Sequence, residues 1–467
     1  MDDLQEFESY MAHLSEGLRH ADRHAGLRGY CTGLMSPLAR KSVEPIAALV
    51  DPLHTRSRHQ SLHHFVADAK WSDEELRLRV CQWVVPKMDF GDGGWWIIDD
   101  TGFPKQGRHS VGVARQYCGV LGKQDNCQVA VSVSLACEAA SVPVAWQLYL
   151  PREWADDEAR RKKAGVPEAS QFATKPAIAL RQIEHLLAQG APKHCVLADA
   201  GYGVDTAFRE RLTELGLLYV VGVTGSVTVW PPGREPLPAP AYSGRGRMLQ
   251  RLRRGDAPQH RPQSIKELAF ELAPQHWHNV TWREGTNARL CSRFARVRVR
   301  AAHRDNLRRE LREPQWLLIE WPKGDREPLK YWLSTLSEDT PLERMVYEAK
   351  MRWRIERDHQ DLKQDLGLAH YEGRGWRGFH HHASLSIAAY AFLLAQRLHH
   401  PDEVGGKKNS AQRQTLALPT HYKPRGSPAG AAPRPILHYE LANAYRLASR
   451  TQPSTMPLLL PPAGPWN

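Results

Sequence analysis

The sequence predicts an α/β fold, with a mixed sheet at its centre and helices on the faces of that sheet. Two observations predict it. Apolar segments that read as consecutive antiparallel strands lie between residues 95 and 150, and helical and buried-strand patterns alternate from residue 174 onward. Such a succession is typical of a mixed sheet covered by helices. Hydrophobic residues make up 42% of the chain, so it can bury a sizeable core and is not disordered throughout.

Residues 1–90 are predicted to form a helical domain that binds DNA. Its clearest helix spans residues 72–85, because Ser72 with Glu75 three residues later is typical of a helix N-terminus. The region is also rich in arginine and histidine. Any one of these side chains is explained by a solvated helical face, but as a group they suit contact with phosphate: Arg19, His20, Arg23, His24, Arg28, Arg56, Arg58, His59, His63 and His64.

Residues 91–224 are predicted to hold the first part of the main sheet. A glycine-rich turn precedes the apolar run WWII, which ends at Asp99 and Asp100 and is typical of a buried strand. Thr174 as a possible N-cap and Gly190 as a stop indicate a helix between them. The other elements expected here are strands over 128–136, 144–150, 194–200 and 217–223 and a helix over 204–216.

The remainder of the chain divides into three predicted parts. Residues 225–328 read as a β-rich insertion, with strands over 294–300 and 316–322. Residues 329–400 complete the core with a long polar helix over 341–366 and an apolar helix over 384–398. Residues 401–467 read as a Pro-rich tail that is expected to be mobile.

Composition excludes several classes of protein. Lys and Arg number 63 against 51 Asp and Glu, and the resulting net charge of +12 favours a polyanionic partner. The longest apolar stretch, ASLSIAAYAFLLA, is shorter than the about 20 residues that a membrane-spanning helix needs. The polar first residues carry no secretory signal. The seven cysteines include no CxxC pair, which argues against a disulfide framework or zinc ribbon and for a reducing cytosol.

Three acids are candidates for metal chemistry: Asp100 after the first apolar run, Asp199 at the end of a later strand, and Glu356 on the long helix. Carboxylates are costly beside an apolar core unless they are paired or bind metal. Converging oxygen ligands suit Mg²⁺ or Mn²⁺, and two such ions can activate the attacking oxygen and stabilise the leaving oxygen of a phosphodiester. Spacing alone leaves open the alternative that either aspartate is only a helix cap.

The long helix carries one polar face. Steps of four, three and four residues place Arg352, Glu356, His359 and Lys363 on the same side of the helix. An apolar stripe beside that side would pack on the sheet. The alternative reading is a salt-bridged surface face that takes no part in chemistry.

Three segments together resemble the acid-bearing motifs of DDE-type (Asp-Asp-Glu) insertion-sequence transposases. They are WWIIDDTGFPKQG, VLADAGYG and RWRIERDHQDLKQDLGLAHYEGRGW. The resemblance is narrowed to the insertion sequence 701-like branch, with its Tyr-Arg-Glu-Lys signature, by NCQVAVSVSLA, YLPREWADDEARRKKAGVP and FATKPAIAL. The similarity extends over residues 36–398, which is most of the chain.

This resemblance implies a ribonuclease-H-like fold and a DNA transposase. Such an enzyme cuts at the terminal inverted repeats of an insertion sequence and joins the ends to target DNA. Asp100, Asp199 and Glu356 would be the catalytic acids and would hold two Mg²⁺ or Mn²⁺ ions. Asp100 is preferred to Asp99 because the family motif places Thr directly after the acid.

The resemblance also implies how DNA is held. Arg352 and Lys363 match signature residues that bind the DNA end, and His359 between them is assigned to DNA as well. Ala349 stands at the Tyr position of the signature, so the phosphate contact of that position is not carried over. The implied partners are double-stranded DNA and, when two ends are paired, a second copy of the chain. The implied location is the cytoplasm of a bacterium, at the nucleoid.

Further basic residues are candidates for DNA contact. In FARVRVR, Arg296, Arg298 and Arg300 fall on one strand face, where like charges in a row cost stability unless DNA phosphate neutralises them. For the looser cluster of Arg245, Arg247, Arg251, Arg253 and Arg254, solvated surface and DNA contact stay open. His380, His381 and His382 lack a partner ligand at metal spacing and are expected near DNA, and Trp95 and Trp96 are expected in the core.

Two other functions are weighed against an active transposase. A domesticated relative would bind DNA without cutting it, and the presence of all three acids argues against that reading. A hydrolase with a nucleophilic Ser or Cys has no support, because the chain has no GxSxG motif.

Overall fold

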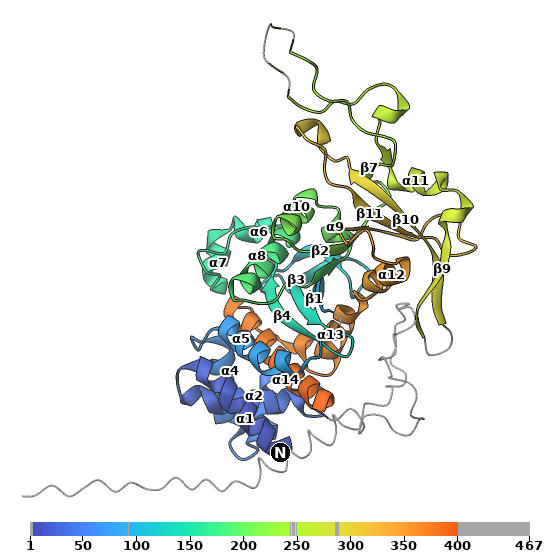
Figure 1. Ribbon diagram of the computed structural model, residues 1–467. Coiled ribbons are helices and arrows are strands. Elements are labelled where there is room, and N and C mark those ends of the chain that lie inside the picture. Colours follow the sequence, from blue (N-terminus) through green and yellow to red (C-terminus); the bar gives the residue numbers. More distant parts are fainter. Residues whose placement is uncertain are drawn as a thin grey trace, which may run out of the picture.

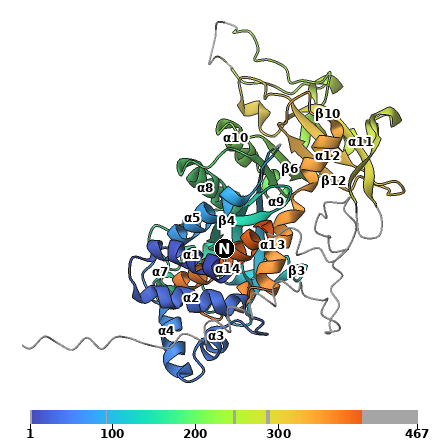
Figure 2. The ribbon, with the colours of Figure 1, turned by 60° about the horizontal axis from the view of Figure 1, so that its bottom comes forward.

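The N-terminal region is a bundle of helices, as predicted. The structure is a computed structural model that describes residues 3–91, 93–242, 244, 248, 250–284 and 289–399. The predicted tail over 401–467 lies outside the described residues. The bundle contains α1 (Asp3–Ser15), α2 (Asp22–Met35), α3 (Val43–Val50), α4 (Thr55–Ala67) and α5 (Asp73–Val84). The late helix α14 (Trp376–His399) lies among them, although it is far away in the sequence (Figures 1 and 2).

The predicted start of α5 is confirmed. The Ser72 hydroxyl accepts a hydrogen bond from the backbone N–H of Glu75 at 3.1 Å, so Ser72 is the N-cap. The apolar positions Leu76, Val80 and Val84 are buried. A helical pattern of burial therefore fixes α5 against the rest of the bundle.

A single mixed sheet runs through the rest of the molecule (Figure 1). Its strand order is β2-β3-β1-β5-β6-β12-β11-β10-β7-β8, with β4 paired to β3 and β9 paired to β10. The strands are β1 (Trp95–Pro104), β2 (Ala114–Cys118), β3 (Lys123–Ala136), β4 (Ser141–Leu148), β5 (Cys195–Ala198), β6 (Tyr219–Val223), β7 (Thr228–Trp230), β8 (Gln263–Ser264), β9 (His278–Glu284), β10 (Arg289–Ala301), β11 (Gln315–Glu320) and β12 (Lys330–Ser334).

The α/β fold class is confirmed. β1 pairs antiparallel with β3, and β3 pairs antiparallel with β4, which matches the predicted run of antiparallel strands. β5 then pairs parallel with both β1 and β6. The helices between these strands are α6 (Arg152–Ala155), α7 (Glu158–Ala164), α8 (Lys175–Ala188), α9 (Ala200–Gly203) and α10 (Thr206–Glu214). The short strand β2, in a segment with no clean alternation, was not predicted.

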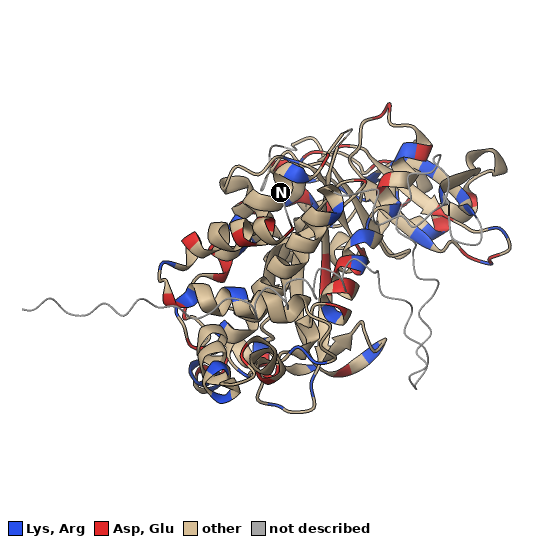
Figure 3. Ribbon diagram, turned by 90° about the horizontal axis from the view of Figure 1, so that it is seen from below, with Lys and Arg blue, Asp and Glu red and all other residues tan. Residues whose placement is uncertain are grey.

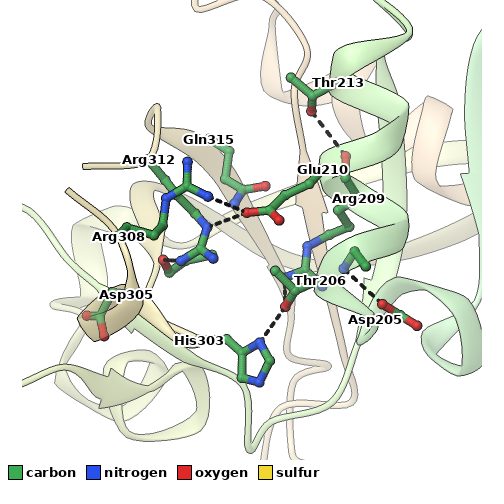
Figure 4. Close-up of polar contacts among 12 residues, drawn as sticks. Asp205, Thr206, Arg209, Glu210, Thr213, His303, Asp305, Arg308, Arg312 and Gln315 are labelled. Carbon is green, nitrogen blue, oxygen red and sulfur yellow. Dashed lines mark hydrogen bonds and ion pairs between the residues drawn. The ribbon is translucent and has the colours of Figure 1, made fainter. Parts of the chain in front are cut away.

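The segment 225–328 does not form a sheet of its own. Its β10 and β11 join the main sheet through β12, which pairs antiparallel with β6. It also contains α11 (Ile265–Glu271). Figure 4 shows how its loop after β10 is tied to α10: Glu210 pairs with Arg308 at 2.9 Å and with Arg312 at 3.0 Å. The predicted domain boundaries remain predictions.

The predicted long helix over 341–366 is two helices, α12 (Leu342–Lys350) and α13 (Trp353–Gln364). The break falls at Met351 and Arg352, which lie in a turn with neither glycine nor proline. Tertiary contacts explain it: Met351 is buried with Ile355 in one core cluster, and Arg352 bonds to Asp99 of β1. A periodic sequence does not reveal such a break, since both halves keep their apolar stripe.

The predicted apolar helix over 384–398 begins earlier, at Trp376. Its first turns contain three histidines, whose polarity hides the helix from a search for apolar runs. Nearly all of α14 is buried, and no helix in the described ranges is long and apolar enough to cross a membrane. Trp95 and Trp96 are buried in the core, as predicted.

Candidate active site at the end of the central strands

Two neighbouring parallel strands bring aspartates to the same edge of the sheet. The β1–β5 pairing ends at Ile98 opposite Ala198, and Asp99, Asp100 and Asp199 follow directly. The Asp199 Oδ1 accepts a hydrogen bond from the Gly201 N–H at 2.9 Å and so caps α9. Asp199 is therefore a helix cap, which is the alternative that the sequence left open for this residue.

Close packing explains the glycines of the VLADAGYG motif. A Cβ on Gly203 would lie 1.9 Å from the carbonyl oxygen of Gly222 on β6, which no side chain can tolerate. α9 therefore lies directly against the backbone of β6. This contact fixes the position of Asp199 at the start of α9.

Asp99 and Asp100 point to opposite faces of the sheet, because successive strand residues alternate. Ile97 belongs to the buried cluster that contains Leu197 and Ile355 of α13, so Asp99, two residues on, faces α13. Asp100 faces α8 instead. There the Lys175 Nζ lies 2.9 Å from the Asp100 Oδ2.

The Arg352 guanidinium connects Asp99 of β1 with Glu356 of α13. Its Nη1 lies 2.9 Å from the Asp99 Oδ2, and its Nη2 donates to Glu356 Oε1 one helical turn further along. Burial would lower the pKa of Arg352, but the charges of Asp99, Glu356 and Asp199 raise it above its ordinary value. The guanidinium is therefore held charged between the carboxylates.

The pKa of Asp99 is shifted by burial and by the neighbouring charges. Burial raises the pKa of Asp99 to about 7; Arg352 lowers it, and the charges of Asp199 and Asp100 raise it. The charges of Asp99, Asp100 and Asp199 therefore interact with one another.

A family comparison covers the part of the chain that contains Asp99, Asp100 and Asp199 and ends before α13. Residues 13–289, more than half of the chain, match the family model of the DDE superfamily endonucleases. The chain belongs to this DDE family. Over 192 residues it is also 35% identical to a probable transposase for insertion sequence element IS701 from Microchaete diplosiphon. That match covers 41% of this chain and 46% of the relative, so the chain spans about half the length of the curated relative it matches.

The predicted DDE resemblance is thus confirmed at the level of the family. Within the described residues, no group of three or more His, Cys, Asp or Glu side chains is already arranged to hold a metal ion. Asp99 and Glu356 both contact Arg352, whereas Asp199 bonds to the Gly201 N–H and Asp100 to Lys175. Their chemistry still fits a divalent cation, because mutually repelling, partly buried carboxylates surround a region that also contains the Tyr202 hydroxyl, a buried group with no hydrogen-bond partner among the described residues.

Lys363 lies near Asp99 and Asp100, but His359 does not face solvent. The Lys363 Nζ donates to the carbonyl oxygen of Gly102 at 2.7 Å, and burial lowers its pKa to about 8. The His359 ring is buried, with Nε2 2.8 Å from the Ser132 hydroxyl. Burial, and then the charges of Lys363 and Arg352, lower its pKa to about 3. We therefore do not retain the assignment of His359 to DNA.

The arginines of β10 contact the protein itself, which corrects the expectation of a free basic face. Arg298 pairs with Glu338 at 2.9 Å and donates to the Pro314 carbonyl. Arg296 donates to the carbonyl of Thr340 and lies over the Trp316 ring. Arg300 is only partly exposed. The sequence predicted the alternation correctly but gave no sign that loop groups and Trp316 cover the polar face.

Two other groups of basic residues, the three histidines of α14 and the arginine cluster over 245–254, were also considered as DNA contacts from the sequence. His380, His381 and His382 were expected near DNA, which is wrong: all three rings are buried and hydrogen-bonded within the protein. In the looser cluster, Arg245 and Arg247 lie outside the described residues. Arg254 pairs with Asp305 at 3.0 Å, so it too serves the insertion itself.

Sequence reasoning passed over two residues near the site. Lys175 lies in FATKPAIAL, a segment used only for the family resemblance, and its pairing with Asp100 depends on the approach of α8 to β1. Tyr202 is in the second acid motif. Burial, followed by the charges of Asp100, Asp99 and Asp199, raises the pKa of Tyr202 well above its ordinary value. Its position between Gly201 and Gly203, directly after the second acid, was the available signal.

Proposed function

We propose that the chain is a transposase that cuts DNA at the ends of an insertion sequence and joins those ends to target DNA. The observation that carries the proposal is the bridge from Asp99 through Arg352 to Glu356, beside Asp199. The central strand order β4-β3-β1-β5-β6, antiparallel and then parallel, supports the ribonuclease-H-like fold that we propose for this part.

In this proposal Asp99, Asp199 and Glu356 hold two Mg²⁺ or Mn²⁺ ions. Such ions activate the attacking oxygen and stabilise the leaving oxygen of a phosphodiester. Asp99 replaces Asp100 in the set because it faces α13, on which Glu356 lies, whereas Asp100 pairs with Lys175 on the opposite face. Asp199 is held by its own helix cap, which limits its movement.

Arg352 and Lys363 are proposed to hold the DNA end. Arg352 uses Nη1 and Nη2 for carboxylates, and a guanidinium has five N–H donors, so it retains donors for a phosphate oxygen. Lys363 adds a positive charge on the same face of the sheet, near Gly102 and over the Phe103 ring. Together they would offset phosphate charge beside the acids.

The proposed reaction has two balanced steps. Water attacks the phosphorus at the element end, the bond from phosphorus to the 3′ oxygen breaks, and a 3′ hydroxyl is released. That hydroxyl then attacks a phosphodiester of the target, forms a new phosphorus–oxygen bond and displaces a target 3′ oxygen. Pairing of two ends would bring two copies of the chain together on double-stranded DNA, in the bacterial cytoplasm at the nucleoid.

The alternative is a domesticated relative that binds DNA but does not cut. The presence of all three acids argues against it, since a protein that only binds phosphate gains nothing from acids beside the phosphate. Incubation of the full chain with duplex carrying the inverted repeats that flank its gene, with and without Mg²⁺, tests both readings. Nicks at the repeat ends that need Mg²⁺ and are lost in Asp199→Asn support the transposase; binding without nicks supports the alternative.

A further inference from the structure

Lys and Arg residues occur in the helical bundle, the core and the insertion (Figure 3), so their number alone does not identify a DNA surface. Whether each of these side chains already has an acidic partner in the protein is more informative. In the bundle, Arg28 pairs with Glu8, Arg77 with Asp73, and Arg79 with Glu16 at 2.7 Å. These arginines are already neutralised by the protein. They need no external anion.

Helix α4 differs in charge from α1, α2, α3 and α5, each of which contains at least one acid. Its sequence, TRSRHQSLHHFVA, contains two arginines and three histidines and no acid. In the described part of the chain, no carboxylate lies within ion-pair distance of Arg56 or Arg58, and the acid that approaches His63 and His64 is Asp68, at 3.9 and 3.8 Å. Arginines in the first turn also oppose the helix dipole, so this composition does not serve the stability of α4.

The outward side of α4 has an ordered row of polar side chains. Leu62, Phe65 and Val66 are buried against the bundle. Arg56, Gln60 and His64, spaced i, i+4 and i+8, are exposed on the opposite side. α4 lies at the outer edge of the bundle, away from the insertion (Figures 1 and 2). The row is therefore open along its length to a large partner.

Glycines of α2 fix α3 and α4 in place. Gly26, Gly29 and Gly33 share one side of α2, and a Cβ on Gly26 would lie 2.7 Å from the Phe65 ring of α4. A Cβ on Gly33 would lie 2.4 Å from Ile46 of α3. Each helical glycine costs about 1 kcal/mol relative to alanine, so the close approach is kept against a local cost. The result is a pair of helices, joined by four residues, with a defined orientation.

We infer that α4 is a DNA-reading helix that enters the major groove and contacts base edges through Arg56 and Gln60. A helix fits that groove, and two helices joined by a short turn present the second one to it. Arginine pairs with the O6 and N7 of guanine, and glutamine with the N6 and N7 of adenine. The exposed residues Ser57 and His63, on the flanks of the row, would meet the phosphates on either side. The inference rests on the proposed function and adds where the sequence of the DNA end is read.

Selection from a pool of randomised duplexes tests this inference. The full chain is incubated with the pool in EDTA, so that cutting plays no part, and bound duplexes are sequenced. The variants are Arg56→Ala and Gln60→Ala, with Gln5→Ala as the matched control, since Gln5 is an exposed helical glutamine on α1. Circular dichroism melting of each variant checks that the bundle is folded.

We expect wild type and Gln5→Ala to select one common sequence. Arg56→Ala and Gln60→Ala should lose preference at one or two neighbouring positions, with affinity for the selected duplex reduced roughly 5- to 100-fold. If both variants melt normally and select the wild-type sequence, α4 does not read bases. An equal loss for all sequences, with a salt slope lower by about 1, would also overturn base reading and assign Arg56 to phosphate.

The selection is independent of the proposed chemistry. Mg²⁺-dependent nicking by a chain whose α4 variants keep the wild-type selectivity would overturn the inference and leave the proposed function standing. Loss of selectivity in the α4 variants without any nicking by wild type would support a DNA-reading helix in a non-cutting protein. Preference for an RNA pool over the duplex pool would overturn the inference outright.

Discussion

The Arg352 Nη1 lies 2.9 Å from the Asp99 Oδ2, which connects the start of α13 to the central strand β1. The next residue, Asp100, has no share in this contact because it faces α8 and pairs with Lys175. These two adjacent aspartates therefore have different ion-pair partners. Their separate roles can be measured.

Asp99→Asn should reduce Mg²⁺-dependent nicking on the order of a thousandfold or more, because losing one ligand of a two-ion site removes most of its catalysis. Asp100→Asn should stay within about tenfold of wild type, since it removes a partly exposed ion pair worth about 0–1 kcal/mol. Initial rates on the same end duplex compare the two. If Asp100→Asn abolishes nicking and Asp99→Asn does not, the motif-based choice of Asp100 is correct and the geometric one is wrong.

Arg352→Ala should weaken binding of the DNA end without weakening binding of metal. The variant loses one phosphate contact, so the slope of log K against log salt should fall by about 0.9 on duplex DNA. Metal affinity should be kept or increased, because Asp99 and Glu356 lose the cation that now bridges them. Titration calorimetry with Mn²⁺ and anisotropy with labelled duplex measure the two quantities. Mn²⁺ affinity that falls as far as in Glu356→Ala would contradict this role.

Arg298→Ala should leave the salt slope for duplex binding unchanged within about 0.3, because its guanidinium is paired with Glu338 and bonded to Pro314. The expected cost is a small loss of stability, about 0–1 kcal/mol, since the ion pair is partly exposed. Arg352→Ala serves as the comparison, because its slope should fall by about 0.9. A fall of about 0.9 for Arg298→Ala would return this strand to the DNA surface.

These cases show what sequence patterns predict and what they miss. An apolar run located β1, alternation located β3, and capping located α5 and α8, because burial and hydrogen bonding within a segment are local properties. The choice between Asp99 and Asp100 depends on which face α13 covers, and the ion-pair partner of Arg298, Glu338, lies 40 residues away in the sequence. The break at Met351 depends on packing against the sheet. Long-range contacts of this kind leave no periodic signal in the segment they affect.

The buried histidines of α14 should make folding stability depend on pH. The His382 ring bonds to the Tyr30 hydroxyl and the Gly367 carbonyl, and burial lowers its pKa from 6.5 to about 4. His381 is also buried, and burial lowers its pKa to about 4 as well. Between these values the unfolded chain binds protons that the folded chain excludes, so stability is lost as the pH falls from about 6.5 towards 4.

The expected loss between about pH 7 and pH 5 is roughly 1–2 kcal/mol for each ring. Asp358 acts in the opposite sense, because burial raises its pKa to about 6 and favours its protonated form in the folded chain. The two contributions are separated by comparing His382→Gln with wild type in urea denaturation at several pH values. The variant should lose stability at pH 7 yet show a smaller decline towards pH 5. The matched control is His63→Gln on the exposed side of α4, which should decline as wild type does; an unchanged decline in His382→Gln would show that this ring does not set the pH dependence.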